Sequence, residues 1–239
     1  MATCGLAAER EAIKPLLPLS DPGDALTTYY ALYHPPALTQ LHVHRDKNGT
    51  VDGFLTACTT GADLFRPLVV MRAETDDVLE SLLHRGLVGG RPYHFVVPLR
   101  YAPALEREVQ LSEQRVGVIL ALDARRFEPV VNVLVVLAEG ASGGLRFEIR
   151  SQGRVMAASG TNWRSPRFAE IYVYVEAEAR GRGWGRSVAS ALTAALLAEG
   201  VQPLYVVKEE DRISRGLAAS LGYEDTGARE FIASGVRRR

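Results

Sequence analysis

Short apolar runs separated by polar turns fill residues 27–100 and predict a first series of β-strands. Each run is rich in the β-branched and aromatic residues that favour strands. Asn48-Gly49 indicates a tight hairpin, because the central residues of such a turn need positive φ. One amphipathic segment, 74–87, predicts a helix capped by Thr75 or Asp76. The predicted strands lie at 27–34, 38–45, 50–61, 66–73 and 91–99.

A second series of apolar runs follows a charged segment, 103–116, which predicts a connecting helix. Residues 183–199 predict a longer helix, in which Val188, Leu192, Ala195 and Leu196 form a stripe that packs on a sheet, and Gly200 ends it in a left-handed conformation. A last helix is expected at 211–221. The predicted strands lie at 117–122, 130–140, 145–163 with a turn inside, 168–175, 203–207 and 228–233.

The two series repeat one order of elements: strand, polar turn, strand, a gap, then an apolar strand. This similarity of pattern predicts an α/β protein made of two tandem halves, 1–108 and 109–239. The halves differ after the apolar strand, because only the second has a glycine-rich turn there, at 178–187.

Composition and charge narrow the class of protein. The 239 residues suffice to bury a core, and two cysteines, Cys4 and Cys58, indicate a reducing, cytoplasmic setting rather than a disulfide framework. The start has no secretory pattern and no apolar run is long enough to span a membrane. The 28 basic residues balance 28 acidic ones, which disfavours nucleic acid as a partner.

Two histidines, His42 and His44, share a face of the strand predicted at 38–45. A pair on one strand can begin a metal site, but no third ligand stands at a suitable spacing. We therefore predict no metal.

The turn "EARGRGWGRS" at 178–187 places Gly181, Gly183 and Gly185 between a predicted strand and a predicted helix. Glycines let a backbone approach a ligand closely, and a helix N-terminus attracts anions, so the turn predicts a pyrophosphate site. Arg186 stands where a Walker loop needs lysine and where a Rossmann fingerprint from Gly181 needs glycine, which excludes both. A plain strand-to-helix turn in an α/β domain is the alternative.

Arg180, Gly183 and Gly185 instead form the pattern Arg-x-x-Gly-x-Gly. Together with the strand before it and the helix after it, this stretch resembles the acetyl-CoA loop of the GNAT N-acetyltransferase superfamily. The following strand and helix, which end in Leu221-Gly222-Tyr223, are also similar to that family. The resemblance covers about 110–235 and is strongest in 168–223.

The resemblance implies a mixed GNAT-like central sheet flanked by helices. Residues 109–239 would be the acetyltransferase domain. Residues 1–108 would be a degenerate GNAT-like half without the cofactor loop, serving on the substrate side or as structure.

The resemblance also implies acetyl-CoA as cosubstrate. Backbone N–H groups of the loop would hold its pyrophosphate, with arginines nearby, and Ser187 would donate to a phosphate oxygen. Main-chain groups of Val173 and Val175, on the strand before the loop, would pair with the amides of pantetheine. Asp211 stands where the family commonly has asparagine. The expected binding residues are Val173, Val175, Arg180, Gly181, Arg182, Gly183, Trp184, Gly185, Arg186, Ser187 and Asp211.

Catalytic roles follow from the same resemblance. Glu170, on the strand that leads to the loop, is expected to act as general base, directly or through water; a paired or solvated strand carboxylate is the alternative. The tyrosine that many members use as general acid would fall at Ala218, which has no hydroxyl. Ser214, Tyr223 or water would then protonate the thiolate.

The resemblance thus implies an acyltransferase that moves an acetyl group from acetyl-CoA to a primary amine. Because the family's tyrosine is missing, a weak or inactive acyl-CoA-binding sensor of the same fold is the alternative. The acceptor and the oligomeric state are left open by the sequence.

Overall fold

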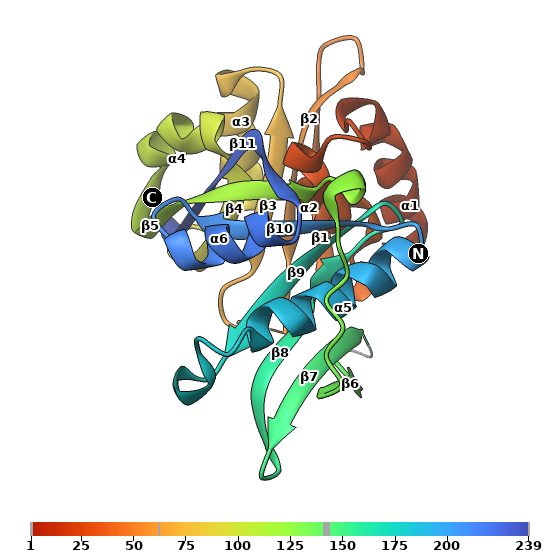
Figure 1. Ribbon diagram of the computed structural model, residues 1–239. Coiled ribbons are helices and arrows are strands. Elements are labelled where there is room, and N and C mark those ends of the chain that lie inside the picture. Colours follow the sequence, from red (N-terminus) through yellow and green to blue (C-terminus); the bar gives the residue numbers. More distant parts are fainter. Residues whose placement is uncertain (1, 62, 141–143, 239) are drawn as a thin grey trace. The chain divides into compact units, whose positions relative to one another are not determined.

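The computed structural model of the chain describes residues 2–61, 63–140 and 144–238, which fall into two compact units. The first unit comprises residues 1–117 and 229–239, and the second comprises residues 118–228. Each unit is built on a mixed sheet flanked by helices, which confirms the predicted α/β class (Figure 1). None of the helices in the described part of the chain is long and apolar enough to cross a membrane.

The first unit contains strands in the order β1-β2-β3-β4-β11-β5. Helix α3 packs on β1, β2 and β3, and its buried Leu79, Leu82 and Leu83 join a core with Leu55 and Phe95. Its elements are α1 (Ala2–Ile13), α2 (Ala25–Thr28), β1 (Thr39–Arg45), β2 (Val51–Cys58), β3 (Leu68–Ala73), α3 (Asp76–Gly86), β4 (Pro92–Pro98) and α4 (Ala102–Glu108).

The second unit contains strands in the order β11-β5-β10-β9-β8-β7-β6. Helix α5 lies across β7, β8 and β9 (Figure 1), with Val188, Leu192 and Leu196 fully buried as the apolar stripe predicts. Its elements are β6 (Val135–Glu139), β7 (Leu145–Ser151), β8 (Arg154–Arg164), β9 (Phe168–Val175), α5 (Trp184–Ala198), β10 (Gln202–Lys208) and α6 (Arg212–Ser220).

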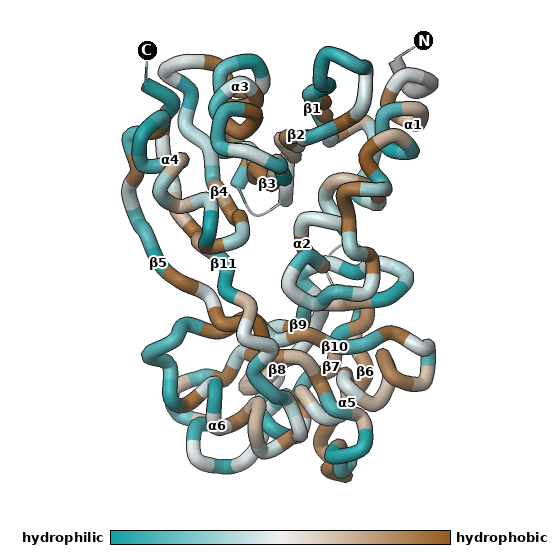
Figure 2. The backbone as a smooth tube through the Cα atoms, turned by 90° about the horizontal axis from the view of Figure 1, so that it is seen from above, coloured by the Kyte–Doolittle hydropathy of each residue, from teal (hydrophilic) through white to brown (hydrophobic). Residues whose placement is uncertain are grey.

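Two long strands, β5 (Val109–Leu122) and β11 (Tyr223–Arg237), contribute residues to both units. β5 is hydrophilic near its start and hydrophobic toward its end (Figure 2), and its side chains change from mostly exposed to mostly buried along the same direction. The bounds of the units therefore differ from the predicted halves, 1–108 and 109–239. Residues 229–239 lie in the first unit because Glu230–Val236 pair with β4, a contact distant in sequence.

The predicted strand at 27–34 is wrong. These residues continue α2 into a single π-helical stretch, Tyr29–Tyr33. Tyr30, Ala31 and Leu32 are buried there, and the Arg10 guanidinium donates to the carbonyls of Ala31 and His34 at 3.0 and 2.6 Å. Tertiary packing and this cap outweigh the strand propensity of the aromatic residues.

Two other local predictions need correction. The charged segment predicted as a helix over 103–116 is helical only through Glu108, because Val109 is buried in the core of the first unit and begins β5. The hairpin after β1 is confirmed, but its loop spans Asp46–Thr50 and only Gly49 has positive φ. Asp46 shapes the loop by accepting from the backbone N–H groups of Asn48 and Thr50.

Phe231 tests the placement of the C-terminal segment in the first unit's core. It is 5% exposed, whereas Phe65 is 83% exposed. Phe231→Ala should lower the free energy of unfolding by about 3–5 kcal/mol, because it removes buried area and leaves a cavity. Phe65→Ala, the matched control, should change it by less than about 0.5 kcal/mol. Chemical denaturation of both variants measures this, and equal effects would contradict the placement.

Candidate functional site

The turn from β9 to α5 depends on two glycines for its conformation. A short 3₁₀ turn, Ala177–Ala179, follows β9, and then Gly181 and Gly183 adopt φ of +75° and +74°. This left-handed region costs other residues about 1–2 kcal/mol. A Cβ at either position would meet none of the described atoms within 4 Å. Both glycines therefore serve the path of the backbone and leave the space above it open.

Gly185 serves close packing instead. A Cβ there would lie 2.9 Å from Cγ2 of Val175 and 3.2 Å from Cδ1 of Leu217. The missing side chain lets the first turn of α5 approach β9 and α6 together. Glycine is therefore needed in this turn for two different reasons: positive φ at positions 181 and 183, and close packing at position 185.

Helix α5 begins with uncapped backbone donors. Its N-cap, Gly183, has no side chain to accept from the first turn, and Ser187 N–H is bonded to the Gly183 carbonyl at 3.0 Å. The N–H groups before it are the ones that a helix leaves without intrahelical acceptors, and the helix dipole adds positive charge at this end. This helix start is therefore suited to bind an anion.

The arginines of the turn add to this positive charge. Within the described residues, neither Arg180 nor Arg182 has an ion-pair partner, and the Arg182 guanidinium lies 5.2 Å from the centre of the Trp184 ring. Arg186 donates to the carbonyl of Ser220 at the end of α6, at 3.1 Å.

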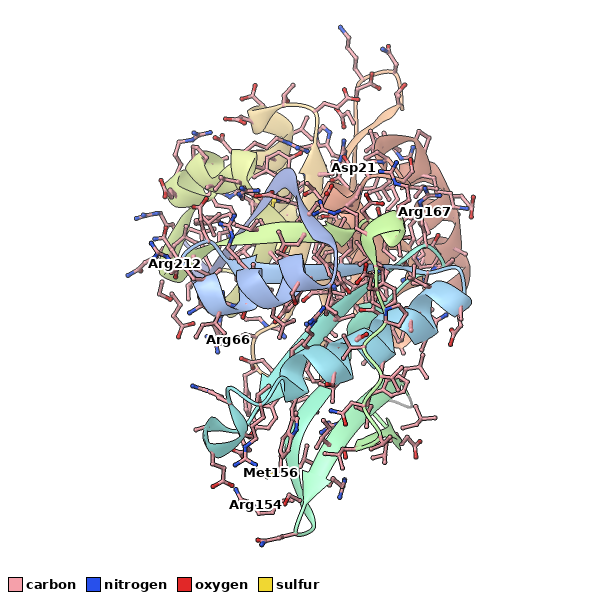
Figure 3. All side chains as sticks on the ribbon, in the orientation of Figure 1. Asp21, Arg66, Arg154, Met156, Arg167 and Arg212 are labelled. Atoms are coloured by element: carbon pink, nitrogen blue, oxygen red, sulfur yellow. The ribbon has the colours of Figure 1, made fainter. Side chains whose placement is uncertain are left out.

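Two nearby carboxylates are neutralised from a different strand. Arg154 of β8, labelled in Figure 3 near the end of the β7–β8 hairpin, lies 3.7 Å from Glu176 and 3.2 Å from Glu178. Because Arg154 pairs with both acidic groups, the charge of Arg180 remains available at the helix start.

A cleft of about 610 Å³ opens at this helix start. β10 pairs with β9 in parallel only where Gln202–Leu204 face Phe168–Glu170, and the lining residues of both strands lie beyond that point. Its lining residues are Val173, Val175, Ala179, Arg180, Gly181, Gly183, Trp184, Gly185, Arg186, Tyr205, Asp211, Ile213, Ser214 and Leu217. The cleft joins a basic end at the turn to apolar walls, which suits a ligand with an anionic group and a long neutral arm.

Most of the residues that the sequence assigns to the cofactor line this one cleft, as does Ser214. Two residues assigned to the cofactor, Ser187 and Arg182, do not line it, and neither do Tyr223 and Glu170, which were assigned to catalysis. Ser187 is 4% exposed, donates to the Gly183 carbonyl at 3.2 Å and accepts from the Asn132 amide at 3.1 Å. Arg182 belongs to the turn but not to the lining. Tyr223 is buried outside the cleft, and its hydroxyl is 2.9 Å from that of Thr193.

Glu170 lies on the opposite face of β9 from Val173 and Val175, as strand alternation requires. Its carboxylate accepts from the Asn162 amide at 2.6 Å and from the Trp163 indole N–H at 2.7 Å. Desolvation raises the pKa of this carboxyl, and the two hydrogen bonds partly oppose the rise. Glu170 is thus a held carboxylate at the last paired position before β9 and β10 separate.

Asp211 and Ser214 form one unit at the start of α6. Asp211 accepts from the backbone N–H of Ser214 at 2.9 Å and from its hydroxyl at 2.8 Å, and hydrogen bonds from Ser214 lower the pKa of the Asp211 carboxyl. Asp211 therefore caps α6 as a carboxylate. It would meet a ligand as an acceptor.

Sequence reasoning missed Tyr205. This residue of β10 lines the cleft and is 7% exposed; burial raises its pKa, and the nearby Ser214 side chain partly opposes that rise. In the apolar run "PLYVV" it is indistinguishable from a core residue. Only the separation of β10 from β9 gives it access to the cleft.

The described residues contain no group of three or more histidine, cysteine, aspartate or glutamate side chains that could hold a metal ion. His44 bonds the Asp52 carboxylate at 2.6 Å instead.

Comparison with known proteins finds one matching family model and solved structures of similar fold. The model described as "FR47-like protein" matches residues 150–232, which include β9, the glycine turn, α5, β10 and α6. No curated protein matches the chain.

Three solved structures are similar in fold. A GCN5-related N-acetyltransferase from Kribbella flavida has a TM-score of 0.63 at 16% identity, covering 90% of this chain and 93% of that one. A tandem GNAT protein from the clavulanic acid biosynthesis pathway has a TM-score of 0.59 at 15% identity, covering 96% and 93%. A Drosophila protein has a TM-score of 0.69 at 13% identity, covering 98% and 96%.

Substituting alanine for Gly185 and for Gly216 distinguishes the effect of close packing on stability from the effect of helix propensity. Gly185→Ala should lower the free energy of unfolding by about 1–3 kcal/mol, because its Cβ would press on Val175. Gly216→Ala, inside α6 and with no described atom within 4 Å of its Cβ, should raise it by up to about 1 kcal/mol. Thermal or chemical unfolding of both variants tests this, and a stabilised Gly185→Ala protein would contradict the close approach of α5 to β9.

Proposed function

The chain has the fold of the GNAT superfamily, and from that premise we propose that it is an N-acetyltransferase that moves an acetyl group from acetyl-CoA to a primary amine. The observation that carries this proposal is the cleft at the start of α5. It combines uncapped backbone donors, the charge of Arg180, which has no ion-pair partner among the described residues, and apolar walls. These are the features that a pyrophosphate attached to a long, mostly neutral arm requires.

The anionic end of the ligand would lie against the turn. The N–H groups from Gly181 to Arg186 would donate to the pyrophosphate, while Arg180 supplies charge. This arrangement needs no side chain at 181 or 183, where the space is open. Ser187 contributes through the position of its helix rather than through its hydroxyl, which is already bonded to Gly183 and Asn132.

The pantetheine arm would run along β9. Beyond Glu170, β9 has no register partner in β10, so backbone groups on that edge are available to amides of a ligand, as in strand addition. Val173 and Val175 line the cleft at this edge, and acetyl-CoA supplies the acetyl thioester.

Glu170 is the residue we propose as general base. A carboxyl with a raised pKa, held by two donors, is suited to take a proton from the ammonium form of the acceptor, directly or through water, so that the neutral amine can attack. Its position on the face of β9 opposite the cofactor cleft would place the acceptor on that face. Tyr172 and Tyr174 share this face with it by alternation.

We further propose that the first unit is a GNAT-like half that has lost its cofactor site. β3 and β4 also separate early, after pairing at Leu68 with His94 and Val69 with Phe95. There the helix that follows, α3, is capped by the Thr75 side chain and carries Asp76 and Asp77 in its first turn, a combination that disfavours anions.

The first unit also fills the edge that its separated strands leave. The Tyr101 hydroxyl accepts from the backbone N–H of Ala73 and donates to its carbonyl, both at 3.0 Å. A side chain thus bonds the groups that a pantetheine arm would need. This supports a structural or substrate-side role for the first unit.

A catalytically weak acyl-CoA-binding sensor is the second candidate. The observation that favours it is Ala218, which is fully buried where the family's tyrosine would stand. Such a protein would bind acetyl-CoA in the same cleft but release no thiol with any amine.

Calorimetric titration of acetyl-CoA into three proteins tests the cofactor. The unchanged protein should bind with micromolar affinity, and Gly183→Glu should weaken binding at least about tenfold more than Gly183→Gln does. Both variants share the left-handed strain at φ +74°, but only glutamate puts a like charge near the pyrophosphate. Equal affinities in the two variants would contradict the anion site, and no binding to the unchanged protein would end both candidate functions.

Glu170→Gln tests the base. With acetyl-CoA and a panel of polyamines, amino acids and peptides, thiol release should fall about a hundredfold or more, while acetyl-CoA affinity stays the same. Raising the pH should recover part of the rate, because more of the amine is then neutral. Glu199→Gln, which removes an exposed carboxylate at the end of α5, is the control. An unchanged rate in Glu170→Gln would make Glu170 a structural carboxylate.

A further inference from the structure

We propose that the Tyr205 hydroxyl donates a hydrogen bond to the sulfur of CoA and stabilises the thiolate as it leaves. This inference rests on the proposed function. It assigns stabilisation of the leaving thiolate to a residue of strand β10. The family's tyrosine would instead stand on α6, at the position of Ala218.

The position of Tyr205 follows from the register of β10. Leu204 faces Glu170 in the last parallel pair, and Tyr205 is the next residue along the strand. Its side chain lines the cleft, and Val207, on the same face of β10, lies in a core shared with α5 and α6. Tyr205 therefore stands at the point where the two strands separate, while the basic turn lies at the far end of β9.

Other candidates for this step are less well placed. Of the residues that line the cleft, Tyr205 is the one with a phenol. Tyr223 packs against Tyr205 with ring centres 6.3 Å apart, but its hydroxyl is bonded to Thr193 away from the lining. Ser214 lines the cleft, and its hydroxyl donates to Asp211 at 2.8 Å.

The Tyr205 hydroxyl can donate in two directions, toward Ser214 or toward a ligand in the cleft. Ser214 has one hydroxyl proton; while it donates to Asp211, its oxygen can accept from Tyr205. If the Ser214 hydroxyl turns to Tyr205, Asp211 still accepts from the Ser214 backbone N–H at 2.9 Å. The phenolic proton is then free to point at a ligand in the cleft.

The chemistry requires a donor that keeps its proton. Burial raises the pKa of Tyr205 above the ordinary value for tyrosine, which is itself above that of a thiol, about 8.5. As the amine nitrogen forms its bond to the acetyl carbon, the carbon–sulfur bond breaks and its electron pair stays on sulfur. The amine proton goes to the base. The sulfur leaves as a thiolate that accepts from Tyr205 and later takes a proton from water.

The test is the thiol pKa of CoA bound to the protein, followed by the ultraviolet absorbance of the thiolate in difference spectra against unliganded protein. This measurement needs no acceptor. The thiol pKa of CoA should be lower in the unchanged protein than in Tyr205→Phe by about one pKa unit, because a hydrogen bond to a charged acceptor is lost. Calorimetry with CoA on the same samples checks that both proteins bind it.

Tyr223→Phe is the matched control, since it removes a buried phenolic hydroxyl next to Tyr205 but outside the cleft lining. A shift in Tyr205→Phe and none in Tyr223→Phe supports the proposal. Equal thiol pKa values in the unchanged protein and Tyr205→Phe, with CoA bound to both, overturn it and leave the proposed function intact. A shift in Tyr223→Phe as large as in Tyr205→Phe also overturns it. Failure of the unchanged protein to bind CoA overturns both proposals.

Discussion

The early separation of β9 from β10 is the constraint on which the site depends. Three residue pairs hold the strands together, and the pairing ends at Glu170 and Leu204. Every buried backbone group needs a partner, so a strand edge that opens inside a sheet must be filled by a side chain or a ligand. Val173, Val175 and Tyr205 line the cleft beyond this point, and Glu170 is the residue of β9 in the last pair. Without this opening, the glycine turn would have no cleft beside it.

The two units solve the same packing problem in different ways. Each has a pair of parallel strands that separate and a helix that begins after the first of them. In the first unit, Thr75 and Tyr101 satisfy the exposed backbone groups with side chains from the chain itself. In the second, Gly183 offers no cap and the lining strands stay apart. A few residues at the ends of elements, rather than the sheet, decide whether such a unit has room for a ligand.

The sequence predicts the parts of the site that have local causes, and the GNAT-like fold that residues 168–223 led us to expect is confirmed. The glycine turn, the stripe of α5 and the cap of α6 follow from residues close to one another. The position of Tyr205 in the cleft could not be predicted, because it depends on the register between two strands more than 30 residues apart. The tyrosine-rich segment 29–33 has the propensity of a strand, but Arg10, which is distant in sequence, bonds its end and favours a helix. The pairing of Glu230–Val236 with β4 is not visible in the sequence for the same reason, since β4 is far away along the chain.

The path of β11 also governs the order in which the protein can fold as it is made. Residues 229–237 lie between β4 and β5 in the first unit, so that unit lacks an inner strand until the end of the chain has been synthesised. The second unit, residues 118–228, is complete earlier, although it begins later. During synthesis, the first 117 residues therefore have two unpaired strand edges until residues 229–237 follow, by which point all residues of the second unit have been made. The chain is made from its N-terminus, but the unit that contains the N-terminus is the last to have all of its residues.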